Sequence, residues 1–151
     1  IKSQMPTILK MAQEWDQGAY LSEVRIFVPQ NKETELILMT FEYQSSQSNT
    51  NLLLIDLYNN GRYQTTKGFY PNGIEQSKPL DINELVIDGQ NALGIVLKEM
   101  SIQLPADHCF ELNLKNNPET NQQNWILLES DCNGYPHIAL TIDSITGEVI
   151  K

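Results

Sequence analysis

Apolar residues recur with helical spacing in two stretches of the chain. The first stretch predicts a helix over residues 6–16, where Pro6 suits the first turn because a missing N–H costs no helical hydrogen bond there. The apolar face of this helix consists of Ile8, Met11, Ala12 and Trp15. The second predicted helix begins after Asp88, a suitable N-cap residue, and ends before Pro105. Its apolar stripe consists of Ala92, Leu93, Val96, Leu97 and Met100.

Each predicted helix is followed by three runs that favour β-strands. Several of these runs alternate between apolar and polar positions, as half-buried strands do. The runs cover residues 21–28, 35–43 and 51–58 after the first helix, and residues 108–115, 124–132 and 137–143 after the second. Polar turns separate the runs, and a further short strand is expected around residues 62–66.

An order of one helix and three strands therefore occurs twice along the chain. The two copies also end alike, with LLIDLYNNG at residues 53–61 and ALTIDSITG at residues 139–147. We interpret this as an internal repeat and predict an α+β fold, made of two repeats of one helix packed on a three-stranded antiparallel sheet. The predicted units cover residues 1–66 and 83–151, and residues 67–82 connect them within one globule.

Composition narrows the classes of function that remain. With 151 residues, of which 40% are apolar, the chain can build a core and is not disordered. The 19 acidic residues outnumber the 10 basic ones and give a net charge of −9, which argues against a nucleic-acid or anionic-membrane binder. No apolar run approaches the ~20 residues that span a bilayer. Because the sequence begins with Ile1 rather than Met, we expect a signal peptide or lipoprotein anchor to have been removed.

The two cysteines flank a predicted hairpin. Its loop is centred near residue 119.5, so opposed residues have numbers that sum to about 239, and Cys109 and Cys132 sum to 241. Opposed residues of an antiparallel pair have Cα atoms ~4.5–5.5 Å apart, which suits a disulfide. A disulfide would indicate an oxidising compartment, periplasmic or extracellular. Two reduced thiols and metal binding are the alternatives.

Three further residues near the same end of the sheet are weak candidates for metal binding, namely His108, Asp131 and His137. However, His108 and Cys109 are neighbours on one strand and point to opposite faces, so both cannot easily bind one ion. We therefore favour two ordinary histidines near a sheet edge. We expect no catalytic residue, no metal and no cofactor.

Residues 143–147, with the sequence DSITG, resemble a calcium loop only superficially, because they lack the spaced run of oxygen ligands that calcium needs. We interpret them as a turn in which Asp143 accepts backbone N–H bonds and Gly147 supplies a positive φ. Residues 56–61 receive the same interpretation.

Three aromatic residues lie in or beside the predicted connection, namely Tyr63, Phe69 and Tyr70. Aromatic side chains on a loop often anchor a protein partner, so these are the candidate partner-binding residues. The alternative is that they cover the junction between the two units.

The end of the chain resembles a PepSY domain. The resemblance rests on WILL at residues 125–128, the strand at residues 137–143 and IDSITGEVI at residues 142–150, together with IDGQNAL at residues 87–93. It covers residues 83–151 and extends more faintly to residues 5–63. PepSY domains occur in propeptides of secreted metallopeptidases and in bacterial envelope proteins. The resemblance implies an extracytoplasmic module that binds or inhibits, and it supplies no catalytic residues.

These observations predict a non-enzymatic binding or regulatory module, periplasmic or secreted, whose partner is a protein or peptide of the cell envelope such as a peptidase. The expected mechanism is burial of surface or addition of a strand at an exposed sheet edge. One alternative is a carrier of small apolar ligands, which would show a deep apolar cavity. A less favoured alternative is a metal-dependent enzyme, which would show titratable groups converging in a cleft.

Overall fold

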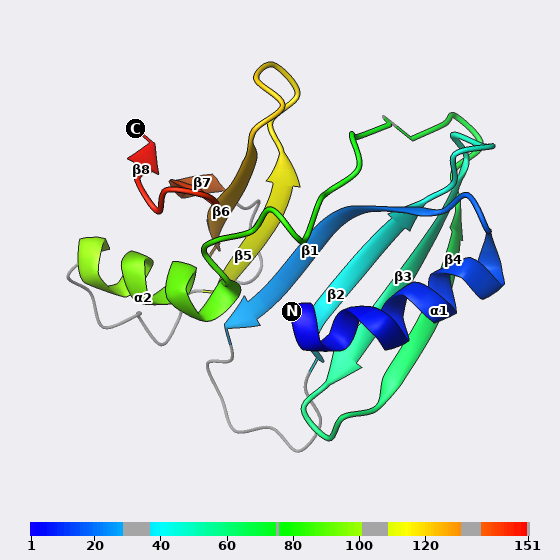
Figure 1. Ribbon diagram of the computed structural model, residues 1–151, viewed down its shortest axis with the longest axis horizontal. Coiled ribbons are helices and arrows are strands. Elements are labelled where there is room, and N and C mark those ends of the chain that lie inside the picture. The colour runs from blue at the N-terminus through cyan, green and yellow to red at the C-terminus, as the bar shows by residue number, and fades with distance from the viewer. Residues whose placement is uncertain (29–36, 75, 101–108, 131–136, 151) are drawn as a thin grey trace.

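A computed structural model describes residues 1–28, 37–74, 76–100, 109–130 and 137–150 of the chain (Figure 1). The described helices are a short 3₁₀ helix at Lys2–Gln4, α1 at Met5–Trp15 and α2 at Gly89–Met100. The described strands are β1 at Tyr20–Val28, β2 at Ile37–Gln44, β3 at Asn51–Tyr58, β4 at Tyr63–Phe69, β5 at Cys109–Asn116, β6 at Gln123–Ser130, β7 at His137–Asp143 and β8 at Val149–Ile150.

The prediction of two repeats, each made of one helix packed on a three-stranded sheet, is wrong. The described strands form one antiparallel sheet of eight strands, in the order β4-β3-β2-β1-β5-β6-β7-β8. Strands β1 and β5 join the halves through six residue pairs, from Glu23–Lys115 to Val28–Phe110. This pairing was not visible in the sequence, because both strands alternate in the same way whether they form sheet edges or a central seam.

Within the described residues, each half of the chain contributes four strands rather than three. The short strand expected around residues 62–66 is β4, which runs for seven residues and pairs with β3 along its whole length. The other addition is the two-residue strand β8 after the turn that follows β7. A strand of two residues has too short an alternation to be recognised in a sequence.

Both helices cover the same face of the sheet (Figure 1). Ile8 and Ala12 of α1, and Ala92 and Val96 of α2, belong to one buried cluster with the apolar residues of the strands. The largest fully buried side chains of that cluster are Trp125, Tyr43, Phe41, Ile8, Leu53, Ile55, Leu112, Leu114, Leu127, Ile142, Val24 and Val96. A single apolar cluster therefore spans the two halves.

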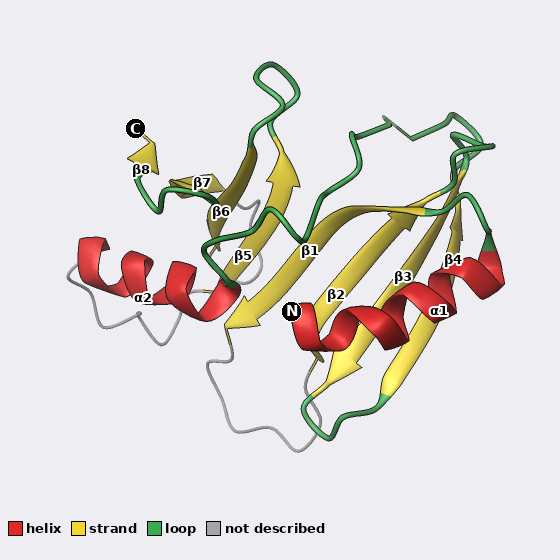
Figure 2. Ribbon diagram, in the orientation of Figure 1, coloured by secondary structure: helices red, strands yellow, loops and turns green. Residues whose placement is uncertain are grey.

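The segment between β4 and α2 passes across the strands (Figure 2), and its later part contributes to this core. Leu80, Ile82 and Leu85 are buried in the common cluster. The N–H of Leu80 donates to the carbonyl of Leu21 at 2.8 Å, and the indole N–H of Trp125 donates to the carbonyl of Ile87 at 2.9 Å. The segment is therefore anchored to β1 in one half and to β6 in the other.

Candidate functional site

The outer edge of β4 is an open hydrogen-bonding edge within the described part of the chain, because β4 stands at the end of the sheet order. Hydrogen bonds at both ends of the β3–β4 pair fix which residues face β3. The N–H of Tyr58 donates to the carbonyl of Arg62, and the N–H of Tyr70 donates to that of Thr50. Bonded pairs in an antiparallel ladder alternate, so even-numbered residues of β4 bond to β3. The odd-numbered residues direct their N–H and C=O groups outward; they are Tyr63, Thr65, Lys67 and Phe69.

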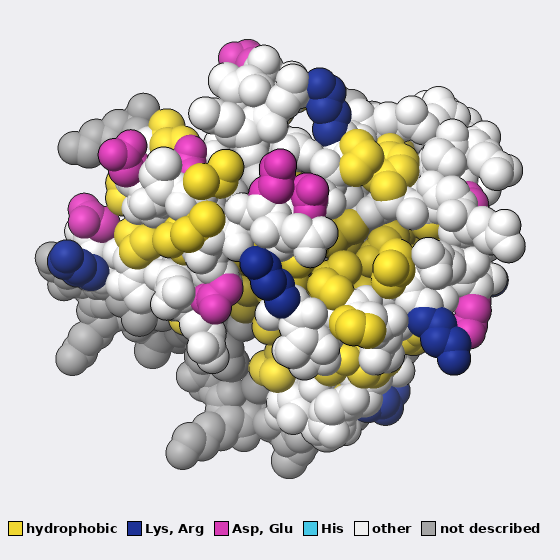
Figure 3. All heavy atoms as spheres, in the orientation of Figure 1, with side chains coloured by type: hydrophobic (Ala, Val, Ile, Leu, Met, Phe, Trp, Pro, Cys, Tyr) yellow, Lys and Arg dark blue, Asp and Glu magenta, His cyan; other side chains and the backbone are white. Residues whose placement is uncertain are grey.

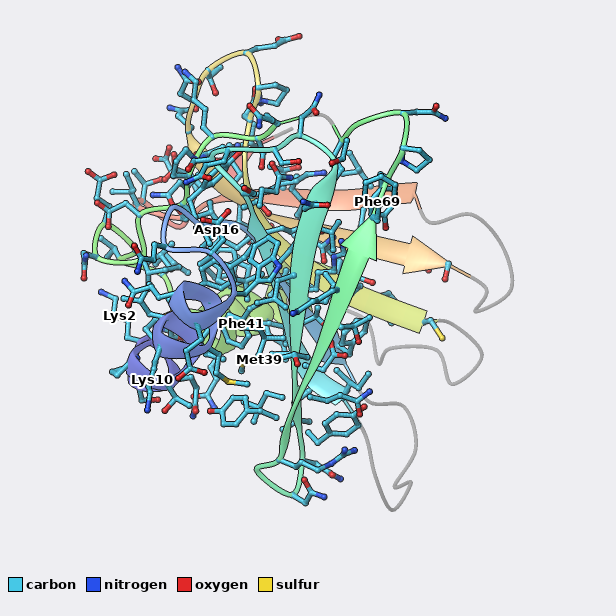
Figure 4. All side chains as sticks on the ribbon, turned by 90° about the vertical axis from the view of Figure 1, so that its right-hand side faces the viewer. Lys2, Lys10, Asp16, Met39, Phe41 and Phe69 are labelled. Atoms are coloured by element: carbon cyan, nitrogen blue, oxygen red, sulfur yellow. The ribbon has the colours of Figure 1, made fainter. Side chains whose placement is uncertain are left out.

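Two of the three aromatic residues predicted to bind a partner are exposed at the end of this edge. Phe69 is 68% exposed and Tyr70 is 48% exposed. Figure 4 shows Phe69 at the end of β4, whereas Phe41 lies between the sheet and α1. The third residue, Tyr63, packs against the core cluster and donates its hydroxyl to the side-chain oxygen of Gln4. Tyr63 therefore joins β4 to the N-terminal helices of its own half, which is a different place from the junction between the two units.

A polar network occupies the middle of the sheet face opposite the helices. The guanidinium of Arg25 donates to Glu42 at 2.8 Å and lies 3.5 Å from the carboxylate of Glu23. Asn113 donates to Glu23 at 2.8 Å, and the hydroxyl of Ser22 donates to Glu42 at 3.0 Å. The network joins β1, β2 and β5, so it links the two halves on the polar face as the apolar cluster does on the other.

Burial raises the pKa of Glu23, and the nearby Arg25 offsets part of that rise. Each carboxylate of this network is held by at least two donors, which is the arrangement of a structural ion-pair network. Sequence reasoning missed the network. The sequence does contain polar residues within the strand segments SEVR and TFEYQ, which indicate a polar sheet face. It does not show which strands are neighbours, because strand order depends on the whole fold.

An apolar groove of about 800 Å³ lies between α1 and residues 79–83. Its lining residues are Lys2, Met5, Pro6, Leu9, Ala19, Tyr20, Leu21, Tyr43, Pro79, Leu80, Asp81, Ile82 and Asn83. Figure 3 shows hydrophobic side chains gathered on the face of the molecule that carries these segments. Sequence reasoning missed the groove, because its two walls are far apart in the chain.

The interpretation of residues 143–147 as a turn is confirmed. The carboxylate of Asp143 accepts the N–H groups of Ile145 and Thr146, both at 2.8 Å, and Gly147 has a φ of 76°. The same interpretation of residues 56–61 is wrong for Asp56. This residue lies within β3 and accepts a hydrogen bond from Thr40 at 2.6 Å.

In the turn after β3, Asn60 takes the role that was expected of Asp56. Its side-chain oxygen accepts the N–H of Arg62 at 2.9 Å, and Gly61 has a φ of 81°. Residues 53–61 and 139–147 are therefore similar in sequence but differ in structure. The side chain that accepts the N–H of the turn is Asn60, not Asp56, in the first stretch, and Asp143 in the second.

The register expected for the cysteine hairpin is confirmed. Residues of β5 and β6 pair with numbers that sum to 239, from Cys109–Ser130 to Asn116–Gln123. Cys132 lies outside the described residues, so the disulfide stays a prediction. His108 and Asp131 also lie outside them, and His137 is placed only by its backbone pairing with Glu129. Within the described residues, no group of three His, Cys, Asp or Glu side chains could hold a metal ion.

None of the described helices is both long enough and apolar enough to cross a membrane. Comparisons with protein-family models, with curated proteins and with solved structures gave no match for this chain.

Proposed function

We propose that this chain is a non-catalytic protein-binding module of PepSY-like type, whose partner adds a strand at the outer edge of β4. The observation that carries the proposal is the row of outward N–H and C=O groups at Tyr63, Thr65, Lys67 and Phe69. Backbone groups at a sheet edge bind an extended segment through main-chain hydrogen bonds, largely without regard to its sequence.

Specificity would come from the side chains at the end of the edge. Phe69 and Tyr70 expose large aromatic surfaces, and residues of this kind carry much of the binding energy at protein interfaces. Lys67 lies among the outward residues of the strand, so an acidic residue opposite it is favoured in the partner. The resemblance to PepSY domains supports an extracytoplasmic role, with a peptidase or another envelope protein as the partner.

The test compares two substitutions of Thr65, an exposed residue whose N–H points outward. Thr65→Pro removes that donor and places a ring in the path of an added strand, but it leaves the bonds to β3 in place. Thr65→Ala keeps the donor and serves as the matched control. We expect each variant to unfold within a few degrees of the wild-type melting temperature.

Binding is measured by capture of envelope and secreted proteins from the source cell, followed by titration of the captured protein. Thr65→Pro should weaken binding by about tenfold or more, since it removes a main-chain bond and adds a clash, whereas Thr65→Ala should bind as the wild type does. Amide exchange at Thr65 and Lys67 should slow when the partner binds. Equal binding by all three proteins, with unchanged exchange at these amides, would show that β4 is not the binding edge.

A further inference from the structure

We propose that the groove between α1 and residues 79–83 is a second binding site, which takes a small, uncharged and mostly apolar molecule with one hydrogen-bond acceptor for the hydroxyl of Tyr43. This site shares no residue with the outer edge of β4. Its volume of about 800 Å³ lies within the range of roughly 300–1,000 Å³ that is common for small-molecule sites.

The walls of the groove come from three parts of the fold. Met5, Pro6 and Leu9 belong to α1, and Leu9 remains 43% exposed although it lies on a helix that packs on the sheet. Leu21 of β1 adds to the lining, and Pro79, Leu80 and Ile82 come from the segment before α2. A ligand seated there would remove apolar surface from water on all three walls, which is the main source of affinity for an apolar molecule.

Of the five buried side-chain atoms without a hydrogen-bond partner among the described residues, the hydroxyl of Tyr43 is the one whose residue lines this groove. Tyr43 lines the groove and is only 1% exposed, yet its hydroxyl has no hydrogen-bond partner among the described residues. A buried hydroxyl without a partner is costly, so such a group in a native protein calls for an explanation. Burial raises the pKa of Tyr43 to about 12, so the hydroxyl keeps its proton at physiological pH and is available to donate a hydrogen bond. A carbonyl, ester or ether oxygen of a ligand would accept it.

The charged groups beside the groove favour an uncharged ligand. The ammonium of Lys2 already donates to the carbonyl of Leu85 at 3.0 Å and reaches that of Asn83 at 3.5 Å. The carboxylate of Asp81 accepts the N–H of Asn83 at 2.9 Å. Both charges therefore have partners within the protein. The net charge of −9 further opposes the approach of an anion.

The test uses the fluorescent probe N-phenyl-1-naphthylamine, which brightens in apolar sites, and its displacement by 2-dodecanone or by dodecanoate. Tyr43→Phe removes only the hydroxyl. Leu9→Asp places a charge on the groove wall, and Ile145→Asp is its matched control, since Ile145 is 48% exposed and lies in the turn after β7. Circular dichroism melts of every variant verify that it folds.

We expect 2-dodecanone to displace the probe from the wild type and from Ile145→Asp, and to bind Leu9→Asp at least about tenfold more weakly. Tyr43→Phe should weaken the ketone by about five- to tenfold, the factor that one net hydrogen bond is worth. Without ligand, the same variant should melt at or above the wild-type temperature, because the lost hydroxyl had no partner. Thr65→Pro should bind the ketone normally, which separates this site from the β4 edge.

Three results would overturn the proposal. The wild type could fail to bind the probe and the ketone at micromolar concentrations. Ile145→Asp could lose affinity as much as Leu9→Asp does. Dodecanoate could bind more tightly than the ketone and lose that affinity in Lys2→Gln but not in Tyr43→Phe, which would define an anion site instead.

Discussion

At the scale of single residues, Glu23 is the group whose ionisation opposes folding. Burial raises its pKa above the usual 4.5, so the folded protein holds the proton more tightly than the unfolded chain. The contribution of Glu23 to stability is therefore fully present at a pH below its pKa in the unfolded chain. This contribution is lost as the pH rises through its higher pKa in the folded protein.

We predict that the free energy of unfolding of the wild type, relative to Glu23→Gln, falls as the pH rises above 4.5. Glutamine keeps an oxygen that can accept the bond from Asn113, so the substitution mainly removes the titration. Urea unfolding at several values of pH between about 4 and 7 measures this difference. A difference that is constant or that rises with pH would contradict it.

At the scale of elements, α2 depends on a capping residue that the sequence identified. The carboxylate of Asp88 accepts the N–H of Asn91 at 2.9 Å, which satisfies one of the first donors of the helix. We predict that Asp88→Ala lowers the free energy of unfolding by about 1 kcal/mol, and that Asp88→Asn, which keeps a capping oxygen, costs clearly less. Chemical denaturation followed by circular dichroism measures the stability of both variants. If Asp88→Asn lost as much stability as Asp88→Ala, the contribution of Asp88 would come from its charge rather than from capping.

The elements were predicted well because their signals are local. The predicted helix at residues 6–16 corresponds to Met5–Trp15, and two of the predicted strands coincide with Asn51–Tyr58 and His137–Asp143. The pairing of β1 with β5 was not predictable, since the residues that pair are about ninety positions apart. The same holds for the candidate sites. Phe69 and Tyr70 could be selected because they are aromatic residues in or beside the predicted connection, but the groove and the orphaned hydroxyl of Tyr43 exist only when distant segments meet.

The hairpin of β5 and β6 carries the prediction about redox state. Its register agrees with the one expected from the sequence, so Cys109 stands opposite Ser130, two residues before Cys132. We predict that protein recovered from its native cell, alkylated under denaturing conditions without reductant, gains no alkyl groups in its intact mass. Protein reduced first should gain two, as the control. Two alkyl groups without reduction would contradict both the disulfide and the argument for an oxidising compartment.

At the scale of the whole molecule, one sheet and one apolar cluster join the two halves, so we predict a single unfolding transition. The two tryptophans test this separately, because Trp15 belongs to α1 in the first half and Trp125 to β6 in the second. In Trp125→Phe the fluorescence reports on the first half, and in Trp15→Phe it reports on the second. Trp125→Phe should be the less stable variant, since Trp125 is fully buried and its N–H bond to Ile87 is lost.

Within each of these two variants, the fluorescence transition in urea should coincide with the transition seen by far-ultraviolet circular dichroism. Leu112→Ala, at the seam where β5 pairs with Ile26 of β1, should lower the stability by about 3 kcal/mol and shift both signals together. If the substitution moved only the signal from Trp125, the halves would be separate folding units, and the pairing of β1 with β5 would be a contact between domains. If both signals shift together, the chain unfolds as one unit. A ligand bound in the groove or at the β4 edge should then raise the free energy of unfolding of the whole chain.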